Sequence, residues 1–306
     1  MQQTVRRFDV VVVAYRSEEH ILACLDSVKQ AAGLDRNIVV DHGDGASARR
    51  AEAAGATVVH DPTNPGFGRG QNRGVALGTA PFVLLLNPDA SMVPGAVVRG
   101  LDVLAARPDV AAVQGVIRSA AGGGPERSRG REVRPVHLLG RAFSLRSLLR
   151  SRMVRALTRH VPAVADHVER VPAAAVDTEW LAATALLVRR TAFEAVGGFS
   201  PDYFLYGEDL DLCRRLRLDG WRLVALSDDW AVHDSGASAA STVEREITWW
   251  NGTMTFAARW WSPVEWMAAL VAAVVECGRL IAREPAARGR VVEGVLRRPL
   301  RYRRRR

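Results

Sequence analysis

The sequence is short of cysteine and of long hydrophobic runs, and each of these shortages excludes a class of protein. Cys24, Cys213 and Cys277 lie far apart and form no CxxC pair, so we expect neither a disulfide framework nor a zinc site, and a reducing cytoplasm fits. The N-terminal apolar run is too short for a signal peptide. The most hydrophobic stretch elsewhere, residues 266–275, is too short to cross a bilayer as a helix. We therefore expect a cytoplasmic protein that is soluble or peripheral at the inner face of the cell membrane.

Basic charge is present in excess, and almost all of it is arginine. The 306 residues contain 42 Lys and Arg against 33 Asp and Glu, a formal net charge of +9, and Lys29 is the only lysine. Such a charge favours an anionic partner: a phosphorylated substrate, a membrane surface or a nucleic acid. With 48% hydrophobic residues the chain can bury a core, and its length allows one large α/β domain with an appendage or two small domains.

The first 117 residues alternate between strand-like and helix-like patterns. The predicted strands cover residues 8–15, 37–41, 56–60, 82–87 and 110–117. Residues 18–33, between the first two strands, have apolar positions at helical spacing. This alternation is typical of βαβ units that form a parallel sheet with helices on both faces. Ligands of such sheets bind beyond the carboxyl ends of the strands, which indicates Tyr15, Asp41, His60 and the Asn-Pro-Asp after Leu86.

The rest of the chain is predicted to be more helical and more basic. A glycine- and arginine-rich loop at 119–135 precedes an amphipathic basic helix or helix pair at 137–161, which suits either ordinary packing or a membrane surface. The next predicted elements are a buried strand at 179–190, a short helix at 191–199, a helix from about Glu208 to Asp219, a strand at 221–226 and a loop at 230–238 that holds His233. From Thr248 onward we expect helices. The last ten residues contain seven arginines and suit either solvent or anionic lipid.

Three polar motifs lie at predicted strand ends. Residues 64–74, NPGFGRGQNRG, form a glycine-rich loop before a helix, where backbone amides can approach a phosphate or a sugar, although the spacing matches no Walker or dinucleotide motif. Residues 84–90, LLLNPDA, end a buried strand at Asp89, which suits either a turn or a hard divalent cation that bridges a diphosphate. The third motif pairs Asp209 with His233. Because a helix and a returning strand separate these two residues, we expect His233 near Asp89.

In this order and spacing, the motifs resemble the inverting glycosyltransferases of family 2, and specifically the bacterial rhamnosyltransferase-like branch. The resemblance covers about residues 8–238 and is carried by VVVAYRS, NPGFGRGQN, LLLNPDA, EWLAATALLVRR, GGFSPDYFLYGEDLDLCRRL and AVHDSGAS. It implies an α/β fold of the GT-A type, a Rossmann-like nucleotide-diphospho-sugar transferase with a mostly parallel central sheet. The implied catalytic domain covers 1–240, with a nucleotide-sugar-binding half at 1–117 and an acceptor-binding half at 118–240. A helical, basic C-terminal extension follows at 241–306.

The resemblance also implies roles for individual residues. Asp89 matches the last acid of the family's DxD-type motif and, with His233, would bind Mg²⁺ or Mn²⁺ on the donor diphosphate. Asp209 matches the acid of the Glu-Asp pair that acts as catalytic base, with Glu208 as its neighbour. The implied nucleotide-sugar-binding residues are Ala14, Tyr15, Ser17, Asp41, Gly66, Phe67, Gly68, Asn72 and Asn87.

The implied chemistry is a single displacement. A sugar hydroxyl is a poor nucleophile, so a carboxylate, here Asp209, must take its proton as it attacks. The metal stabilises the charge on the leaving nucleoside diphosphate, and attack from the opposite side inverts the anomeric centre. Asp211, in the same acidic segment, is expected to support the helix by pairing with Arg214 or Arg215. The predicted acceptor-binding residues are Trp180, Phe204 and Tyr206, whose aromatic faces suit either a sugar ring or a core.

Two segments depart from the family pattern. The family commonly has an Asn and a Ser after the second-strand Asp, whereas this chain reads DHGDGASA from Asp41, with His42 and Asp44. This leaves open whether the loop from Asp41 to Ser47 preserves nucleotide binding. The DxD position begins with Asn87, as is usual in the rhamnosyltransferase-like branch, and this leaves activity without a tightly held metal open.

The resulting functional prediction is transfer of a sugar from a nucleotide diphosphate to a glycan or polyprenyl-linked acceptor in cell-envelope polysaccharide synthesis. The branch resemblance implies L-rhamnose from dTDP-rhamnose as donor. A lipid-linked acceptor would account for the basic segment 137–161 and the arginine tail, both of which could rest on an anionic membrane surface. The alternative is a catalytically inert sugar- or membrane-binding relative. No nucleic acid is expected as a partner, because no recognition motif occurs and acids crowd the predicted cleft.

Overall fold

The structure, a computed structural model, describes residues 6–143, 175–234 and 242–303 in two compact units. The first unit comprises Met1–Arg131, Arg170–Pro201 and Asp209–Ser238. The second comprises Glu132–Glu169, Asp202–Glu208 and Ala239–Arg306. Most of the predicted basic helix 137–161 lies outside the described residues, as does the end of the arginine tail. The domain boundaries predicted after residues 117 and 240 stay a prediction.

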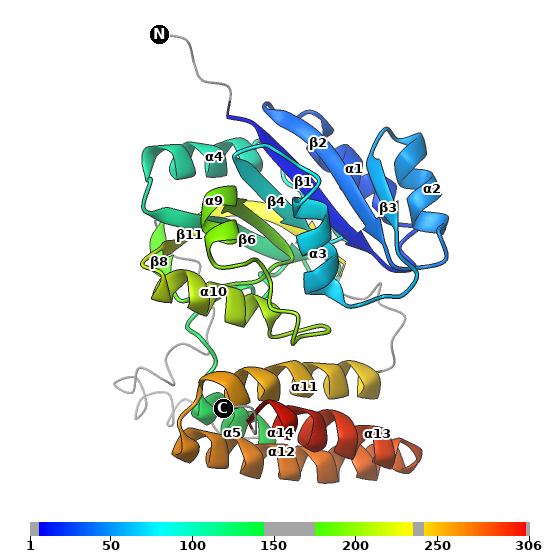
Figure 1. Ribbon diagram of the computed structural model, residues 1–306, viewed down its shortest axis with the longest axis vertical. Coiled ribbons are helices and arrows are strands. Elements are labelled where there is room, and N and C mark those ends of the chain that lie inside the picture. Colours follow the sequence, from blue (N-terminus) through cyan, green and yellow to red (C-terminus); the bar gives the residue numbers. More distant parts are fainter. Residues whose placement is uncertain (1–5, 144–174, 235–241, 304–306) are drawn as a thin grey trace. The chain divides into compact units, whose positions relative to one another are not determined.

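The first unit is built on one large sheet, which nine strands of its described part form (Figure 1). β3 (Thr57–His60), β2 (Leu34–Asp41), β1 (Phe8–Ala14) and β4 (Phe82–Leu86) lie side by side in that order and are parallel. The sheet continues with β10 (Ala185–Arg189), β6 (Val110–Ser119), β11 (Arg222–His233) and β5 (Ala90–Met92). β8 (Val176–Thr178) pairs with β11. β10 runs antiparallel between β4 and β6, whereas β6 and β11 are parallel.

Helices cover both faces of this sheet, because its central strands are apolar on both sides. All seven residues of β1 are buried, and they alternate between two cores: Val10 and Val12 face one, Val11 the other. The first core includes side chains of α1 (Ile21–Lys29), α2 (Ala46–Ala53) and α4 (Ala96–Ala106). The second includes side chains of α3 (Phe67–Val75), α9 (Arg190–Ala195) and α10 (Glu208–Leu218).

Two predicted elements are wrong in extent. The single strand predicted at 179–190 is interrupted, since β9 (Trp180–Leu181) pairs with β7 (Arg129–Gly130) in a separate two-stranded sheet before β10 begins. The backbone of Ala182 and Ala185 is instead held by the buried Gln114 side chain, whose Nε2 donates to both carbonyls at 2.6 and 3.0 Å. A hydrogen bond from a distant side chain cannot be predicted from the hydrophobic pattern of the segment.

The sequence predicts His233 in a loop, but it is the last residue of β11. The strand continues through the polar residues after Leu226, because register shifts between Ala225 and Ala231 absorb them and pairing with β6 then resumes. A polar bulge interrupts the apolar run without ending the strand. The extra length carries His233 to the far edge of the sheet.

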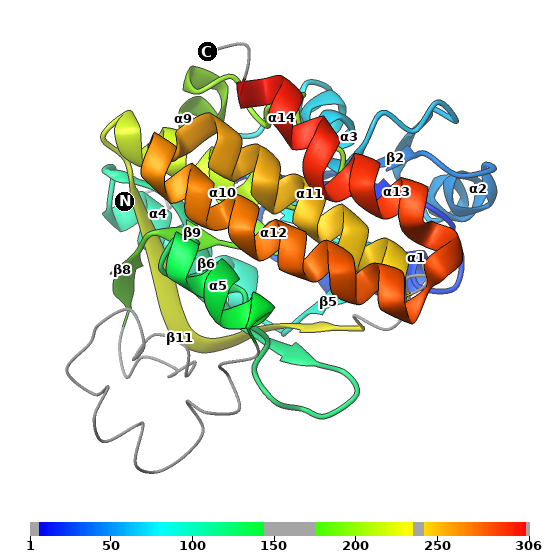
Figure 2. The same ribbon diagram turned by 90° about the horizontal axis from the view of Figure 1, so that it is seen from below.

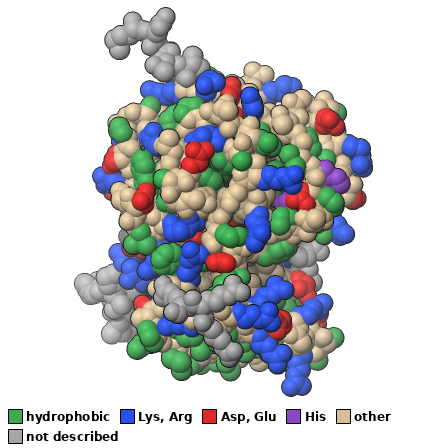
Figure 3. All heavy atoms as spheres, viewed as in Figure 1, with side chains coloured by type: hydrophobic (Ala, Val, Ile, Leu, Met, Phe, Trp, Pro, Cys, Tyr) green, Lys and Arg blue, Asp and Glu red, His purple; other side chains and the backbone are tan. Residues whose placement is uncertain are grey.

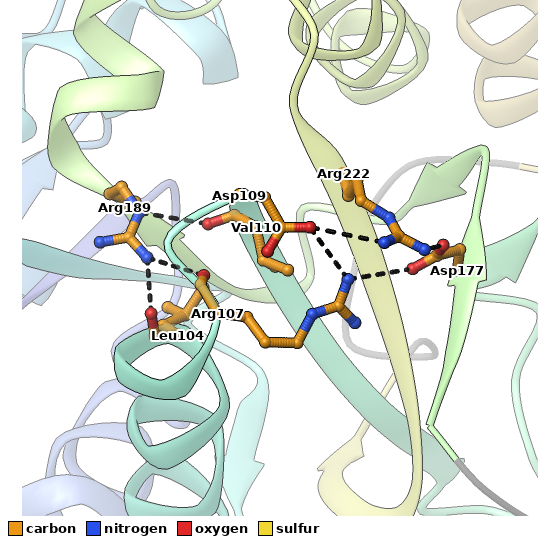
Figure 4. A network of polar contacts seen from close by, with 7 residues as sticks. All are labelled: Leu104, Arg107, Asp109, Val110, Asp177, Arg189 and Arg222. Carbon is orange, nitrogen blue, oxygen red and sulfur yellow. Dashed lines mark hydrogen bonds and ion pairs between the residues drawn. The ribbon is translucent and has the colours of Figure 1, made fainter.

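A polar network ties the amino-terminal ends of β6 and β11 together (Figure 4). Its members are Leu104, Arg107, Asp109, Val110, Asp177, Arg189 and Arg222. Arg107 and Arg222 each pair with Asp109 and with Asp177, so the edge strand β8 is bound to the start of its neighbour. Since His233 lies at the opposite end of β11, this network holds the end of the sheet away from the candidate site.

The second unit is helical in its described part (Figure 2). Its elements are α5 (Pro135–Ala142), α11 (Thr242–Trp260), α12 (Pro263–Arg283), the short helices η1 (Pro285–Ala287) and α13 (Arg288–Val292), the π-helical turn η2 (Glu293–Arg297) and α14 (Arg298–Arg303). A capping box of Ser262 and Glu265 starts α12, with Pro263 in its first turn. Among the described helices, none is both long enough and apolar enough to cross a membrane.

Candidate active site

The sheet brings Asp89 and His233 together. Asp89 follows β4 and precedes β5, and β5 pairs antiparallel with β11 so that Ala90 lies opposite His233. The Asp234 backbone N–H donates to the Asp89 carbonyl at 2.9 Å, which continues this pairing by one residue. As a result, His233 Nε2 lies 3.2 Å from Asp89 Oδ1. The predicted proximity of these two residues is confirmed.

Glu126 is a third member of this cluster and was missed by the sequence reasoning. Its Oε2 lies 2.8 Å from Nδ1 of His233, on the other side of the imidazole from Asp89. Burial lowers the pKa of His233, but the hydrogen bonds and negative charges of Asp89 and Glu126 outweigh it and raise the pKa to about 9. A contact between residues 107 positions apart has no local sequence signal.

The cluster has part of the chemistry that a divalent cation requires. Oδ1 of Asp89 is buried and has no well-aligned hydrogen bond in the described structure, although it lies 3.2 Å from Nε2 of His233. A carboxylate oxygen beside an imidazole suits Mg²⁺ or Mn²⁺. Within the described ranges, no three His, Cys, Asp or Glu side chains converge in a way that could hold an ion. Asp89 and His233 therefore stay candidates for a cation that phosphate oxygens and water would complete.

Asp209 lies in the first turn of α10 and has a perturbed acidity. Its Oδ1 accepts a hydrogen bond from the Leu210 N–H at 2.7 Å. Although part of its surface is accessible, the protein crowds the carboxyl group, and this burial raises its pKa to about 6 against the lowering effects of Leu210, Trp180 and Ala183. The Trp180 indole N–H faces this region but forms no well-aligned hydrogen bond. An acid with such a pKa is suited to proton transfer near neutral pH.

A short backbone link connects Asp209 with the Asp89 cluster. The Asn87 N–H, two residues before Asp89, donates to the Thr184 carbonyl at 2.8 Å, and the neighbouring Ala183 amide faces the Asp209 carboxyl group. The end of β4 and the start of α10 therefore border the same turn before β10. The candidate base and the candidate metal-binding residues are brought to one edge of the sheet.

The neighbouring acid Asp211 is part of a buried ion pair. It is fully buried, and its Oδ2 accepts a hydrogen bond from Arg215 Nε at 2.7 Å, while Arg215 Nη1 donates to the Val196 carbonyl at 2.6 Å. The predicted pairing with Arg215 is confirmed, and it is a buried pair, not a surface one. Glu208 is also buried. The acidic segment thus combines one acid that stabilises the fold with one whose acidity is tuned.

The loops after β1 and β2 are held by their own polar side chains. Both carboxylate oxygens of the buried Asp41 accept backbone N–H groups, from Gly43 at 2.9 Å and from Ala48 at 3.2 Å. The Ser17 N–H donates to Ser47 Oγ at 3.0 Å. Ala14 accepts a hydrogen bond from the next loop through its carbonyl, and Tyr15 is 52% exposed. Their roles in nucleotide binding stay predictions.

The departure at His42 has a packing explanation. His42 is buried, and its Nδ1 lies 2.9 Å from the Asp61 carbonyl. A Cβ at Gly70 in α3 would lie 2.6 Å from His42 Nε2, so the histidine fills the space that this glycine leaves. Asp44 is exposed and accepts the Ala46 N–H at 3.0 Å at the start of α2. Both unusual residues support the loop.

The glycine-rich segment forms the start of α3. Gly66 precedes the helix with a φ of 106°, which favours glycine, and Phe67 packs edge-on against Phe199. The Asn72 side chain exchanges two 2.8 Å hydrogen bonds with the Phe199 backbone. Gly68 is buried in the first turn. Asn72 therefore clamps the glycine-rich helix to the Gly-Gly-Phe turn, and its contact with a nucleotide stays a prediction.

Gln71 was missed by the sequence reasoning. It is fully buried, and neither side-chain amide atom has a hydrogen-bond partner in the described structure. An unsatisfied buried amide is costly, so such a group typically hydrogen-bonds to water or ligand. Of the predicted acceptor residues, Trp180 lies beside Asp209, whereas Phe204 and Tyr206 are exposed residues of the second unit whose role stays a prediction.

Comparisons with known proteins show the family of the chain. The family model described as "Glycosyltransferase like family 2" matches residues 6–252. The chain is 27% identical over 285 residues to N-acetylglucosaminyl-diphospho-decaprenol L-rhamnosyltransferase of Mycobacterium tuberculosis, covering 82% of this chain and 88% of that protein. It is also 38% identical over 71 residues, or 23% of its length, to rhamnosyltransferase WbbL of Escherichia coli.

Solved structures share the fold at low sequence identity. Mannosyltransferase PcManGT from Pyrobaculum calidifontis, in complex with GDP-Man and Mn²⁺, matches with a TM-score of 0.54 and 16% identity over 97% of this chain and 86% of its own. GalNAc-T7 with UDP, GalNAc and Mn²⁺ matches with a TM-score of 0.60 and 11% identity over 86% of this chain and 49% of its own. These likenesses confirm the architecture predicted from the sequence.

Proposed function

The chain belongs to glycosyltransferase-like family 2, and from this premise we propose that it transfers L-rhamnose from dTDP-rhamnose to a polyprenyl-diphosphate-linked sugar. It is a glycosyltransferase of the GT-A fold, and single-displacement inversion fits its family. The donor and acceptor are proposed from the names of its relatives. The observation that carries the proposal is the juxtaposition of an acid with a pKa of about 6, Asp209, with the Asp89–His233 cluster at one sheet edge.

Asp209 is proposed as the catalytic base. Above its pKa the carboxylate is ionised and can take the proton of the acceptor hydroxyl as that oxygen attacks the anomeric carbon. The Leu210 N–H donates to Oδ1 and thereby orients the carboxylate. Glu208 precedes it in the buried first turn of α10 and is proposed to position it. The protonated Asp209 then releases its proton to solvent when the product leaves.

Asp89 and His233 are proposed to hold a divalent cation, whose charge stabilises the leaving diphosphate when bound. Glu126 holds the ring of His233 from the side remote from Asp89, so that Nε2 faces Asp89, the other residue that would hold the cation. On the donor side, the exposed Tyr15, the loop after Asp41 and the start of α3 at Gly66 are proposed to bind the nucleotide. Aromatic stacking of the base and backbone amides for the phosphates are the interactions these elements can supply.

The test is donor binding followed by transfer. Calorimetric titration of dTDP-rhamnose, UDP-GlcNAc and GDP-mannose, with and without Mn²⁺, is expected to give metal-dependent binding of dTDP-rhamnose alone. Asp89→Ala is expected to abolish the metal dependence, whereas Glu52→Ala, which changes an exposed acid of α2 outside the candidate site, is expected to retain it. Transfer is then followed on a GlcNAc-diphosphate acceptor with a short soluble tail. Absence of binding by every donor would favour the inert relative.

A further inference from the structure

One face of α12 is apolar and uncovered. Val264, Met267, Val271 and Val274 are 80%, 59%, 48% and 58% exposed, and their spacing of three, four and three residues places them on one side of the helix. We call these four side chains the α12 stripe. Between Glu265 and Glu276 the helix contains no charged residue. Hydrophobic side chains lie along the edge of the second unit in Figure 3, where Figure 1 draws α12.

The opposite face of α12 explains why the stripe is not part of the core. Trp266, Ala269, Ala273 and Leu280 are buried, and through this face the helix contacts α5 and α11. The small alanines allow close approach of neighbouring helices. The four side chains of the stripe lie on the other side of the helix and are exposed, so they do not contribute to this packing. Large exposed apolar patches on soluble proteins typically mark interaction sites, and a row of four such side chains on one helix face is a candidate for one.

The excess charge of the protein is confined to the second unit. The sequence ranges of the first unit contain 22 Lys and Arg and 22 Asp and Glu, whereas those of the second contain 20 and 11, so the second unit carries the whole net charge of +9. Four exposed arginines at the end of α12 and beyond form no ion pair with described residues: Arg283, Arg288, Arg297 and Arg298. Basic side chains are visible over α13 and α14 in Figure 3.

We propose that the α12 stripe docks on an anionic lipid bilayer surface, with the helix lying in the interfacial plane and these arginines beside the headgroups. An apolar helix face on a unit rich in exposed arginine is the combination that binds such surfaces. The ten-residue uncharged stretch is too short to span, so the helix lies on the membrane. A second copy of the chain is disfavoured as occupant, because a two-fold contact through α12 would bring two strongly basic units together. The choice of lipid rests on the proposed function, which requires a membrane-confined acceptor.

The test is co-sedimentation of the full chain with phosphatidylcholine vesicles, with and without phosphatidylglycerol. The wild type is expected to bind the anionic vesicles and to bind the neutral ones weakly. Val274→Glu is expected to weaken binding about tenfold or more, because it places a charge in the apolar face. The matched control is Leu218→Glu, which adds the same charge at a 68% exposed position of the first unit and is expected to bind like the wild type.

Each result decides the matter in one direction. Equal binding by Val274→Glu and the wild type, or no binding by the wild type, overturns the docking surface. A wild-type dimer in sedimentation velocity that Val274→Glu dissociates, without vesicle binding, assigns the stripe to a second copy instead. Transfer to the short-tailed soluble acceptor is measured in parallel. If the wild type does not transfer the sugar, the proposed function is wrong but the docking surface is unaffected. If Val274→Glu still transfers the sugar to this acceptor, its weaker vesicle binding does not come from a damaged active site.

Discussion

Replacement of Asp209 by asparagine is expected to remove activity while stabilising the fold at neutral pH. Burial holds the pKa of this carboxyl group at about 6, against an ordinary value of 3.8. Ionised Asp209 therefore opposes folding: the unfolded chain loses its proton near pH 4 and the folded chain only near pH 6, so this residue's contribution to stability falls between those values. Above about pH 6 the full cost, about 1 to 3 kcal/mol, is present. The neutral amide of Asp209→Asn avoids this cost, and its oxygen can still accept the Leu210 N–H.

Two assays measure these effects. In wild-type kinetics, kcat/KM is expected to decline below about pH 6 and to be about tenfold lower at pH 5 than on its plateau, because only the ionised carboxylate accepts the proton. In urea unfolding, the free energy of unfolding of Asp209→Asn is expected to exceed that of the wild type at pH 8 and to equal it near pH 4. Asp211→Asn is the control from the same helix turn, since it removes a paired carboxylate and is expected to destabilise the protein at pH 8.

Either of two results would refute the role of Asp209 as a base whose pKa is raised by burial. Retained activity in Asp209→Asn would mean that another group accepts the proton. A loss of stability at every pH would mean that the carboxylate is needed by the fold and that burial does not oppose its ionisation. A gain at pH 8 that disappears at pH 4, together with lost transfer, is the pattern that only a tuned base produces.

Three further predictions concern the neighbouring residues. Glu126→Gln is expected to weaken Mn²⁺ binding by about tenfold in calorimetry, because the ring of His233 loses a charged partner, and unchanged affinity would leave Glu126 without that role. Arg215→Ala is expected to lower the free energy of unfolding by about 3 to 5 kcal/mol, because Asp211 stays buried without its partner, and the double change with Asp211→Leu should recover part of the loss. Gly70→Ala is expected to cost about 1 to 3 kcal/mol in urea unfolding, because its Cβ would meet His42 and Val13, whereas Gly55→Ala, at an open position, tests the strain of a positive φ alone.

Much of the first unit could be predicted from local patterns. Strands such as β1 and β4 are apolar throughout because they are covered on both faces, and a continuous apolar run is visible in one dimension. The helix that begins at Glu208 was predicted from its acidic first turn and the glycine after it. The predicted strand limits were wrong in two places. Before β10, the side chain of Gln114, distant in sequence, binds backbone carbonyls that a continuous strand would have paired. In β11, a bulge carries polar residues through the strand.

The sequence alone determined which residues are candidates for the chemistry of a transferase: an acid at the end of β4, an acid at the start of α10 and a histidine near the end of the match. Those choices rest on residue type and order. Tertiary structure alone decided how two acids only two positions apart differ, since Asp211 is buried beside Arg215 whereas burial raises the pKa of Asp209. It also added Glu126, through a contact across 107 residues, and it left one side of α12 uncovered. Desolvation and long-range pairing depend on which surfaces meet, and that is a property of the folded chain.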